Sequence, residues 1–255
     1  MDSALQTWRE WQQPPRQKPN VVETLSGGHS HKSYRVSDGE QQRVIRLENP
    51  ASRKLALPRD TEIEIQTLAA KQGLAANIVY IGDNFLVSDY LTGEHWPENP
   101  SEQNLQQLGS ALRKLHQLAV SDHSFDMASH IGNYWQQLME KSSPIPEELA
   151  QSKPAIEKLL KQFKADSDPV VCHQDLHPGN LLITTTGIKF LDWEYAANND
   201  RYFDLACLCE NFSLSDSQRH SLFNHYGLLN IDHHKLQNQR SIARHLESLW
   251  WALQA

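Results

Sequence analysis

The chain has 255 residues, enough for one large domain or two small ones around a substantial hydrophobic core. Hydrophobic residues make up 39% of it and charged residues 22%, with seven each of Trp, Tyr and Phe, which excludes an intrinsically disordered protein. The formal net charge of −7 argues against general binding to nucleic acid or to an anionic membrane, and three cysteines do not suggest a disulfide framework.

The N-terminal segment lacks the basic start and apolar run of a signal peptide. No stretch approaches the roughly 18 apolar residues that a membrane span needs, so we expect a cytoplasmic protein. Residues 3–12 predict a short amphipathic helix with Leu5, Trp8 and Trp11 on one side, which the prolines between positions 14 and 19 end.

The rest of the first 90 residues predicts a β-rich lobe with one main helix. Asp38 and Gly39 form a turn signal between two strand patterns and predict a hairpin. Pro58 opens a helical pattern that Gly73 ends. In chain order we expect strands at 21–25, 32–36 and 42–47, a helix at 58–72, and strands at 78–81 and 85–90.

The pattern becomes mainly helical after residue 100. Leucines at spacings of three and four predict a helix over 101–118. We therefore expect an N-terminal lobe over 1–90, a linker over 91–100 and a larger lobe over 101–255, with a ligand cleft between the lobes. Beyond that helix the expected elements are helices 132–141 and 146–164, strands 170–173, 181–184 and 188–191, and helices 200–211, 216–226 and 233–253.

The residues best suited to chemistry lie in the strand-rich part of the second lobe. His173, Asp175 and Asn180 follow the spacing H-x-D-x-x-x-x-N, and Asp192 comes twelve residues after Asn180. The segment between the last two reads as a hairpin, which would make them neighbours. Two oxygen donors held together suit Mg²⁺, and Asp175 on the same loop can orient an acceptor hydroxyl and accept its proton. This arrangement is the one that phosphoryl transfer needs.

Three segments of this region resemble the choline kinase and aminoglycoside phosphotransferase superfamily, most closely bacterial thiamine kinases and bacterial choline kinases. The resemblance implies an α+β, protein-kinase-like fold with two lobes and the cofactors ATP and Mg²⁺. It runs from about Val21 to the final helix and is specific for the superfamily but not for the substrate. The segments are His-Gln-Asp-Leu-His-Pro-Gly-Asn at 173–180, Leu-Asp-Trp-Glu-Tyr-Ala at 191–196, and Asp-Arg-Tyr-Phe-Asp-Leu-Ala at 200–206.

The resemblance implies a phosphate-covering loop at residues 25–35. Gly27 and Gly28 would let backbone amides approach phosphate because neither has a Cβ. Bacterial thiamine kinases commonly have Thr-Asn where this chain has Ser30 and His31. That departure leaves open whether Ser30 or another side chain touches the phosphate.

The third strand resembles the one that carries the phosphate-binding cation, which is Arg46 in this chain. Arginine can bind phosphate oxygens in a fork and stays charged. Its partner is expected to be a glutamate of the next helix, where Glu62 and Glu64 compete. Glu62 is favoured because it shares a helical face with Ile65 and Ala69.

The resemblance places adenine at the end of the fifth strand, where backbone groups usually read the base. Asp89, Tyr90 and Leu91 are candidates there by position, together with Ser88. His173 and Asp204 are expected to support the catalytic loop rather than to act on the substrate.

Other features favour ordinary structural roles. None of the close histidine pairs, such as His29 and His31, follows a zinc pattern. The three cysteines are expected to be buried core thiols, and the tryptophans are more often core residues than ligand contacts. Glu194, Glu210 and the tryptophans are nevertheless the places where a cationic substrate would bind.

Together these features predict a kinase that transfers the γ-phosphate of ATP to a hydroxyl of a small molecule, expected to be cationic. Thiamine is the favoured acceptor, and choline, ethanolamine and an aminoglycoside are the rivals. A nucleotide-binding pseudokinase is the alternative from another class, although Asp175, Asn180 and Asp192 are all present. A nucleic-acid-binding protein conflicts with the acidic balance. The oligomeric state and the number of Mg²⁺ ions stay open.

Overall fold

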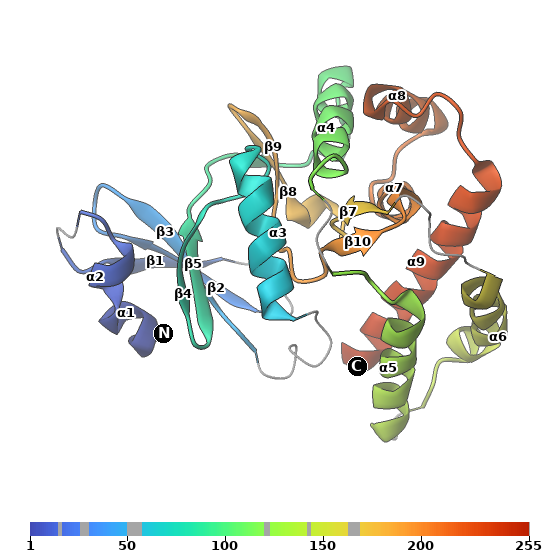
Figure 1. Ribbon diagram of the computed structural model, residues 1–255, viewed down its shortest axis with the longest axis horizontal. Helices are drawn as coiled ribbons and strands as arrows, with labels where there is room; N and C mark the ends of the chain where they lie inside the picture. The colour runs from blue at the N-terminus through green and yellow to red at the C-terminus, as the bar shows by residue number, and fades with distance from the viewer. Residues whose placement is uncertain are drawn as a thin grey trace.

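The computed structural model describes residues 1–14, 17–25, 31–49, 58–119, 123–141, 144–162 and 169–254. It has a sheet-rich N-terminal lobe and a larger helical C-terminal lobe, which is the expected kinase-like fold (Figure 1). In the part of the chain covered by these ranges, none of the helices combines the length and the apolar character that a bilayer crossing requires. The lobe boundaries proposed from the sequence, at residues 90 and 100, stay a prediction.

The N-terminal lobe is built on a five-stranded antiparallel sheet in the order β1-β2-β3-β5-β4. The hairpin predicted around Asp38 and Gly39 is confirmed, because β2 and β3 pair from Lys32↔Leu47 to Ser37↔Gln42. The strands are β1 (Asn20–Leu25), β2 (Lys32–Ser37), β3 (Gln42–Leu47), β4 (Ile78–Gly82) and β5 (Phe85–Asp89).

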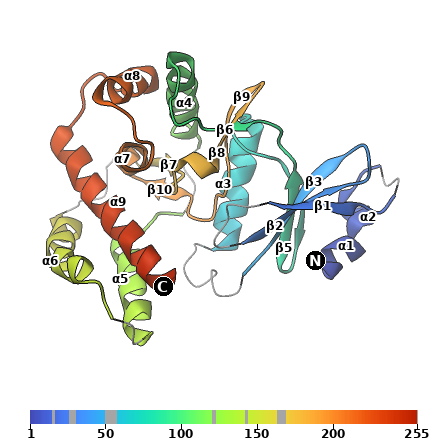
Figure 2. The same cartoon turned by 180° about the vertical axis from the view of Figure 1, so that it is seen from behind.

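Helix α3 (Arg59–Lys71) lies between this sheet and the C-terminal lobe, as both views show (Figures 1 and 2). Its buried residues Ile65 and Ala69 join the large hydrophobic core of the C-terminal lobe rather than the core of the sheet. The helix therefore ties the two lobes together.

The single helix expected over residues 3–12 is wrong. The structure has two short helices, α1 (Asp2–Gln6) and α2 (Trp8–Trp11), with Thr7 between them. The carbonyl of Ala4 accepts hydrogen bonds from the Thr7 hydroxyl at 3.2 Å and from the Trp11 indole at 3.1 Å. Side chains that bond the backbone in this way compete with the regular helical pattern. The apolar face is as expected, because Trp8 and Trp11 are buried against the sheet with Ile45 and Val87.

The C-terminal lobe contains six α-helices and two small sheets among its described residues. Helix α4 (Glu102–Leu115) starts at a capping box between Ser101 and Asn104. Helix α5 (Met127–Glu140) begins five residues before its expected start, because the Asp126 side chain caps it by accepting from the Ser129 amide at 3.1 Å. The other helices are α6 (Glu147–Gln162), α7 (Arg201–Asn211), α8 (Asp216–Tyr226) and α9 (His233–Gln254).

The strands of this lobe flank residues 173–180, the predicted catalytic loop. Strands β8 (Leu181–Thr184) and β9 (Gly187–Phe190) form the predicted hairpin, and β6 (Glu94–His95) pairs with β8. Strand β10 (Ala197–Asn199) pairs with β7 (Val170–Cys172). The two- and three-residue strands β6 and β10 were not predicted, because so short a segment shows no alternation. Strand β6 lies within residues 91–100, the segment expected as a linker, and pairs with β8.

Candidate active site

The predicted catalytic loop, residues 173–180, is anchored by one buried carboxylate. The side chain of Asp204 on α7 is 0% exposed. It accepts hydrogen bonds from the backbone amides of His173 at 2.9 Å and Gln174 at 2.8 Å. Gln174 has φ 67°, a left-handed conformation that a residue other than glycine rarely adopts without such support. The predicted supporting role of Asp204 is confirmed.

A histidine that the sequence analysis missed extends this support. Nε2 of His116, at the end of α4, lies 3.0 Å from the Asp204 carboxylate, and its Nδ1 lies 2.8 Å from the Tyr226 hydroxyl. Because both His116 nitrogens are engaged, the loop is fixed to α4 and α8 as well as to α7. The imidazole of His173 supports a different segment, with Nε2 2.9 Å from the carbonyl of Leu191, next to Asp192.

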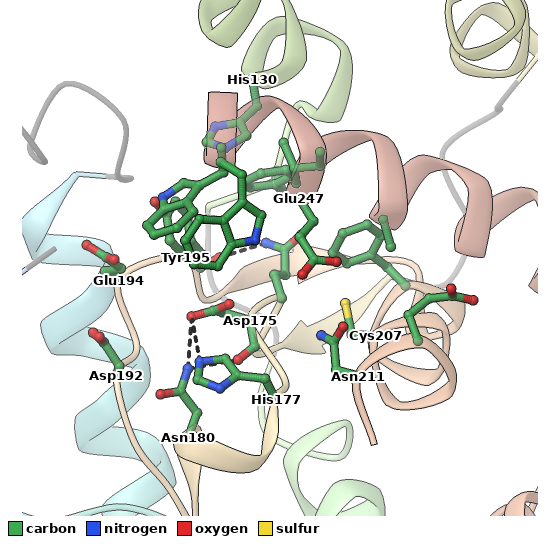
Figure 3. A pocket seen from close by; sticks show the side chains of 18 of the residues that line it. His130, Asp175, His177, Asn180, Asp192, Glu194, Tyr195, Cys207, Asn211 and Glu247 are labelled. Carbon is green, nitrogen blue, oxygen red and sulfur yellow. Dashed lines mark hydrogen bonds and ion pairs between the residues drawn. The ribbon is translucent and has the colours of Figure 1, made fainter. Parts of the chain in front are cut away.

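Asp175 and Asn180 are brought together at the two ends of one turn. The Asn180 side-chain amide donates to the Asp175 carbonyl at 2.9 Å and to its carboxylate at 2.8 Å (Figure 3). The 3₁₀ turn Pro178–Asn180 (η2) makes this possible. Since the amide nitrogen of Asn180 is used in this way, its side-chain oxygen is the atom left to bind another group.

Asp192 lies beside Asn180, as the hairpin prediction required. The amide of Leu191 donates to the Asn180 carbonyl at 2.9 Å, which closes the β8–β9 hairpin at its open end. Asp192 has φ 56°, a strained conformation of the kind found at functional sites. The amide oxygen of Asn180 and the carboxylate of Asp192 are hard oxygen donors, so this pair fits Mg²⁺.

The predicted phosphate-binding cation lies against these residues. Arg46 on β3 forms an ion pair with Glu62 on α3 and a second one, of 3.1 Å, with Asp192. The choice of Glu62 over Glu64 is therefore confirmed. Glu64 instead lies 3.4 Å from His123 and is about half exposed. Arg46 thus joins both lobes at the expected site of metal and phosphate.

The electrostatics of the loop favour a proton on Asp175. Burial and the negative charges of Asp192 and Glu194 raise the pKa of Asp175 to about 7. The side chain still has 37% of its surface accessible from the cavity that it faces. A carboxyl group with a pKa near neutrality is well matched to accept and release a proton.

One cavity, of about 300 Å³, lies under the N-terminal sheet. Arg46, Asp89, Tyr90 and Leu91 all line it. The carboxylate of Asp89 is already bound by Arg43 and Asn77, both at 2.8 Å, and its backbone amide donates to the carbonyl of Asn77 at 3.0 Å. Gly27, Gly28 and Ser30 lie outside the described residues.

A second cavity, of about 580 Å³, lies on the other side of the catalytic loop, between α5, α7 and α9. Five carboxylates line it, and the carboxylate of Glu210 among them is held by Arg240 and Arg244. Among the described residues, Glu247 has no such partner. The acidic lining residues are Asp175, Asp192, Glu194, Glu210 and Glu247, and the aromatic ones are Phe125, His130, Tyr134, Tyr195, Phe203, Trp250 and Trp251.

The expectations about tryptophans and cysteines have different outcomes. Trp193 is buried in the core, as expected, and so are all three cysteines. Burial raises the pKa of the Cys172 and Cys207 thiols well above the usual value, which makes them unreactive. The core expectation is wrong for Trp251, which is 52% exposed and lines the larger cavity. The amphipathic pattern of α9 could not show that one end of its apolar face borders a cavity.

The two lobes, the intervening cleft and the anchored loop define a kinase-like phosphotransferase fold. The chain belongs to the phosphotransferase enzyme family (APH), whose sequence profile matches residues 21–238. Two curated relatives are each 28% identical. The probable ethanolamine kinase A of Dictyostelium discoideum matches over 91% of this chain and 78% of its own length. The thiamine kinase of Escherichia coli O1:K1 / APEC matches over 73% of this chain. The matched part covers 65% of the length of that relative.

Solved structures agree on the fold. The choline kinase LicA from Streptococcus pneumoniae has a TM-score of 0.76 at 21% identity, covering 92% of this chain and 86% of its own. A structure of LicA in complex with AMP has a TM-score of 0.78 at 19% identity, covering 99% of this chain and 89% of its own. At these identities the similarity concerns the fold.

Proposed function

We propose that this protein is an ATP-dependent kinase that transfers the γ-phosphate to a hydroxyl of a small cationic acceptor, with thiamine as the favoured one. One observation carries the proposal: Asn180 and Asp192 line both the cavity under the sheet and the acidic, aromatic cavity. Nucleotide in the first and acceptor in the second would meet at these two residues. Asp175, which lines the second cavity, lies at the same junction.

Each residue at the junction then has a role that its position supports. Arg46 binds phosphate oxygens, and Glu62 holds its guanidinium in place. Asn180 and Asp192 hold Mg²⁺, which neutralises the phosphate charge when it is bound. Asp175 accepts a hydrogen bond from the acceptor hydroxyl, orients its oxygen for in-line attack and takes its proton. The amides of Asp89 and Tyr90 already donate to the carbonyls of Asn77 and Gln42, so the base contacts the other backbone groups of the segment from Asp89 to Leu91.

The lining of the larger cavity supports a cationic acceptor. Trp250, Trp251 and Tyr195 offer aromatic faces, and Glu247 and Glu194 offer negative charge. A volume of about 580 Å³ is in the usual range for small-molecule sites and accommodates the two rings of thiamine as well as smaller amines. The thiamine, ethanolamine and choline kinases among the similar proteins support the same class of acceptor.

The test is ATP consumption by the purified protein with Mg²⁺ over a panel of thiamine, choline, ethanolamine and aminoglycosides. We expect turnover with a cationic acceptor, highest with thiamine, and a phosphorylated product in equal amount to ADP. Turnover highest with choline or an aminoglycoside would overturn the choice of thiamine. An absence of turnover with every acceptor, despite nucleotide binding, would favour a pseudokinase.

Replacing Glu247 by Gln is expected to raise KM for the cationic acceptor by about fivefold to tenfold, because a charge-assisted contact is lost. The KM for ATP should stay unchanged, since Glu247 is not part of the lining of the nucleotide cavity. Steady-state kinetics on both substrates measures this. The matched control is Glu148→Gln on the exposed side of α6, which should change neither KM. An unchanged acceptor KM in Glu247→Gln would contradict this contact.

The rate should also depend on pH through Asp175. Because the pKa of Asp175 in the free protein is about 7, the carboxyl is protonated below that pH and cannot take the hydroxyl proton. With Mg·ATP kept well below its KM, so that the free protein is the main form, we expect kcat/KM for the acceptor to fall about tenfold per pH unit below about pH 7. The fall in kcat should begin at a lower pH than the fall in kcat/KM, because bound cations favour the charged carboxylate of Asp175. A kcat/KM that stays flat from about pH 8 to about pH 5.5 would contradict the role of Asp175 as base.

A further inference from the structure

A histidine and two carboxylates converge where the two lobes meet. His31, just before β2, has its Nε2 2.9 Å from Oε2 of Glu194. His31, Asp192 and Glu194 each have a potential ligand atom within 4.8 Å of the other two. His31 lines the nucleotide cavity, Glu194 the acceptor cavity and Asp192 both. The cluster thus lies where the transferred phosphate would pass.

The group is largely buried, although Asp192 keeps 23% of its side-chain surface exposed, and its carboxylates outnumber the cations beside them. The side chains of His31 and Glu194 are only 6% and 3% exposed. Nδ1 of His31 is buried with no hydrogen-bond partner among the described residues. Arg46 is the one cation that the described residues pair with this group, and its charge is shared among Glu62, Asp192 and Glu194. Buried carboxylates in this situation favour a bound cation.

The distance between His31 and Glu194 suits two ligands of one cation. Neighbouring ligands of an octahedral ion with bonds of about 2.1 Å lie about 3.0 Å apart, and opposite ligands about 4.2 Å apart. The 2.9 Å contact between His31 and Glu194 corresponds to a neighbouring pair. The second cluster of this kind, His116 with Cys172 and Asp204, differs because its carboxylate already accepts from two backbone amides and lies against His116.

We propose that His31 is a ligand of the divalent cation at this centre, together with Asp192 and Glu194, and that it shifts the metal preference from Mg²⁺ towards Mn²⁺. Mg²⁺ favours oxygen ligands, whereas imidazole suits transition metals. The inference rests on the proposed function, because it concerns the cation expected at Asn180 and Asp192.

Pulsed EPR on the full-length protein with Mn²⁺ and β,γ-methylene ATP tests this without turnover. Nitrogen coordinated to Mn²⁺ modulates the electron spin echo, and labelling the histidines with ¹⁵N changes that modulation while the adenine nitrogens stay ¹⁴N. We expect a histidine signal in the wild-type protein and its loss in His31→Asn. The exposed His220→Asn is the matched control and should keep it. In calorimetry, the ratio of Mn²⁺ to Mg²⁺ affinity should fall about tenfold in His31→Asn.

Three outcomes are distinguishable. A histidine signal that depends on His31 supports the proposal. Binding of Mn²⁺ that is lost in Asp192→Asn, but with no histidine signal in wild-type protein, overturns the role of His31 and leaves the proposed function intact. Binding of Mn²⁺ that does not depend on Asp192 at all overturns both the role of His31 and the metal site of the proposed function. The labelled wild-type sample keeps the test valid even if His31→Asn folds poorly.

Discussion

Replacing Asp175 by Asn is expected to lower kcat by about 10²- to 10⁴-fold, the usual contribution of a positioned general base. Asparagine has the same shape and can still bond the Asn180 side chain, which lies 2.8 Å from the Asp175 carboxylate. It cannot accept the proton of the acceptor hydroxyl. Because Asp175 does not line the nucleotide cavity, nucleotide affinity should stay within about threefold of wild type.

The comparison needs kcat from ADP release and nucleotide affinity from calorimetry on the same preparations. Glu98→Gln is the matched control, since it makes the same chemical change at an exposed position outside both cavities and should keep the wild-type rate. Near-normal turnover in Asp175→Asn would show that another group accepts the proton. Loss of nucleotide binding together with the rate would mean that the variant disturbs the fold.

Replacing Asp204 by Asn is expected to lower the free energy of unfolding by about 3 kcal/mol and kcat by at least about tenfold. The buried carboxylate of Asp204 accepts from the amides of His173 and Gln174 and lies against His116. An amide offers only one acceptor oxygen, so its NH₂ group would face a donor. Without that support the left-handed Gln174 and the catalytic loop would relax, which explains the loss of rate.

Chemical denaturation and steady-state kinetics measure these two effects. The matched control is Asp232→Asn, since Asp232 is an exposed residue whose side chain accepts from the Lys235 amide at the start of α9. Asparagine caps helices as well as aspartate does, so this variant should stay within about 0.5 kcal/mol of wild type. An Asp204→Asn protein with wild-type stability and rate would contradict the anchoring role of this carboxylate.

The fold was predictable where local patterns were long. Leucines at helical spacing predict α4, and turn residues between alternating segments predict the β2–β3 and β8–β9 hairpins. The predictions failed where tertiary contacts decide. The carbonyl of Ala4 is bonded by two side chains and separates α1 from α2. Strands β6 and β10 form only because a partner strand lies alongside.

In the candidate site, too, some residues were predictable from the sequence and others were not. Asp175, Asn180 and Asp192 lie on one loop and one hairpin, so their spacing carries information about their geometry. The pairing of Arg46 with Glu62 follows from helical periodicity. Glu247, Tyr134 and His116 come from separate helices, whose separation along the chain is not constrained by the site. A single sequence contains no signal that would group them.

The most direct test of the central claim is a single reaction of the purified protein with ATP, Mg²⁺ and thiamine, analysed by mass spectrometry and ADP release. We predict a phosphorylated thiamine in equal amount to the ADP formed, and at most a trace of either with Asp175→Asn. ADP released without any phosphorylated acceptor, or equal yields from the wild-type and Asp175→Asn proteins, would contradict the account.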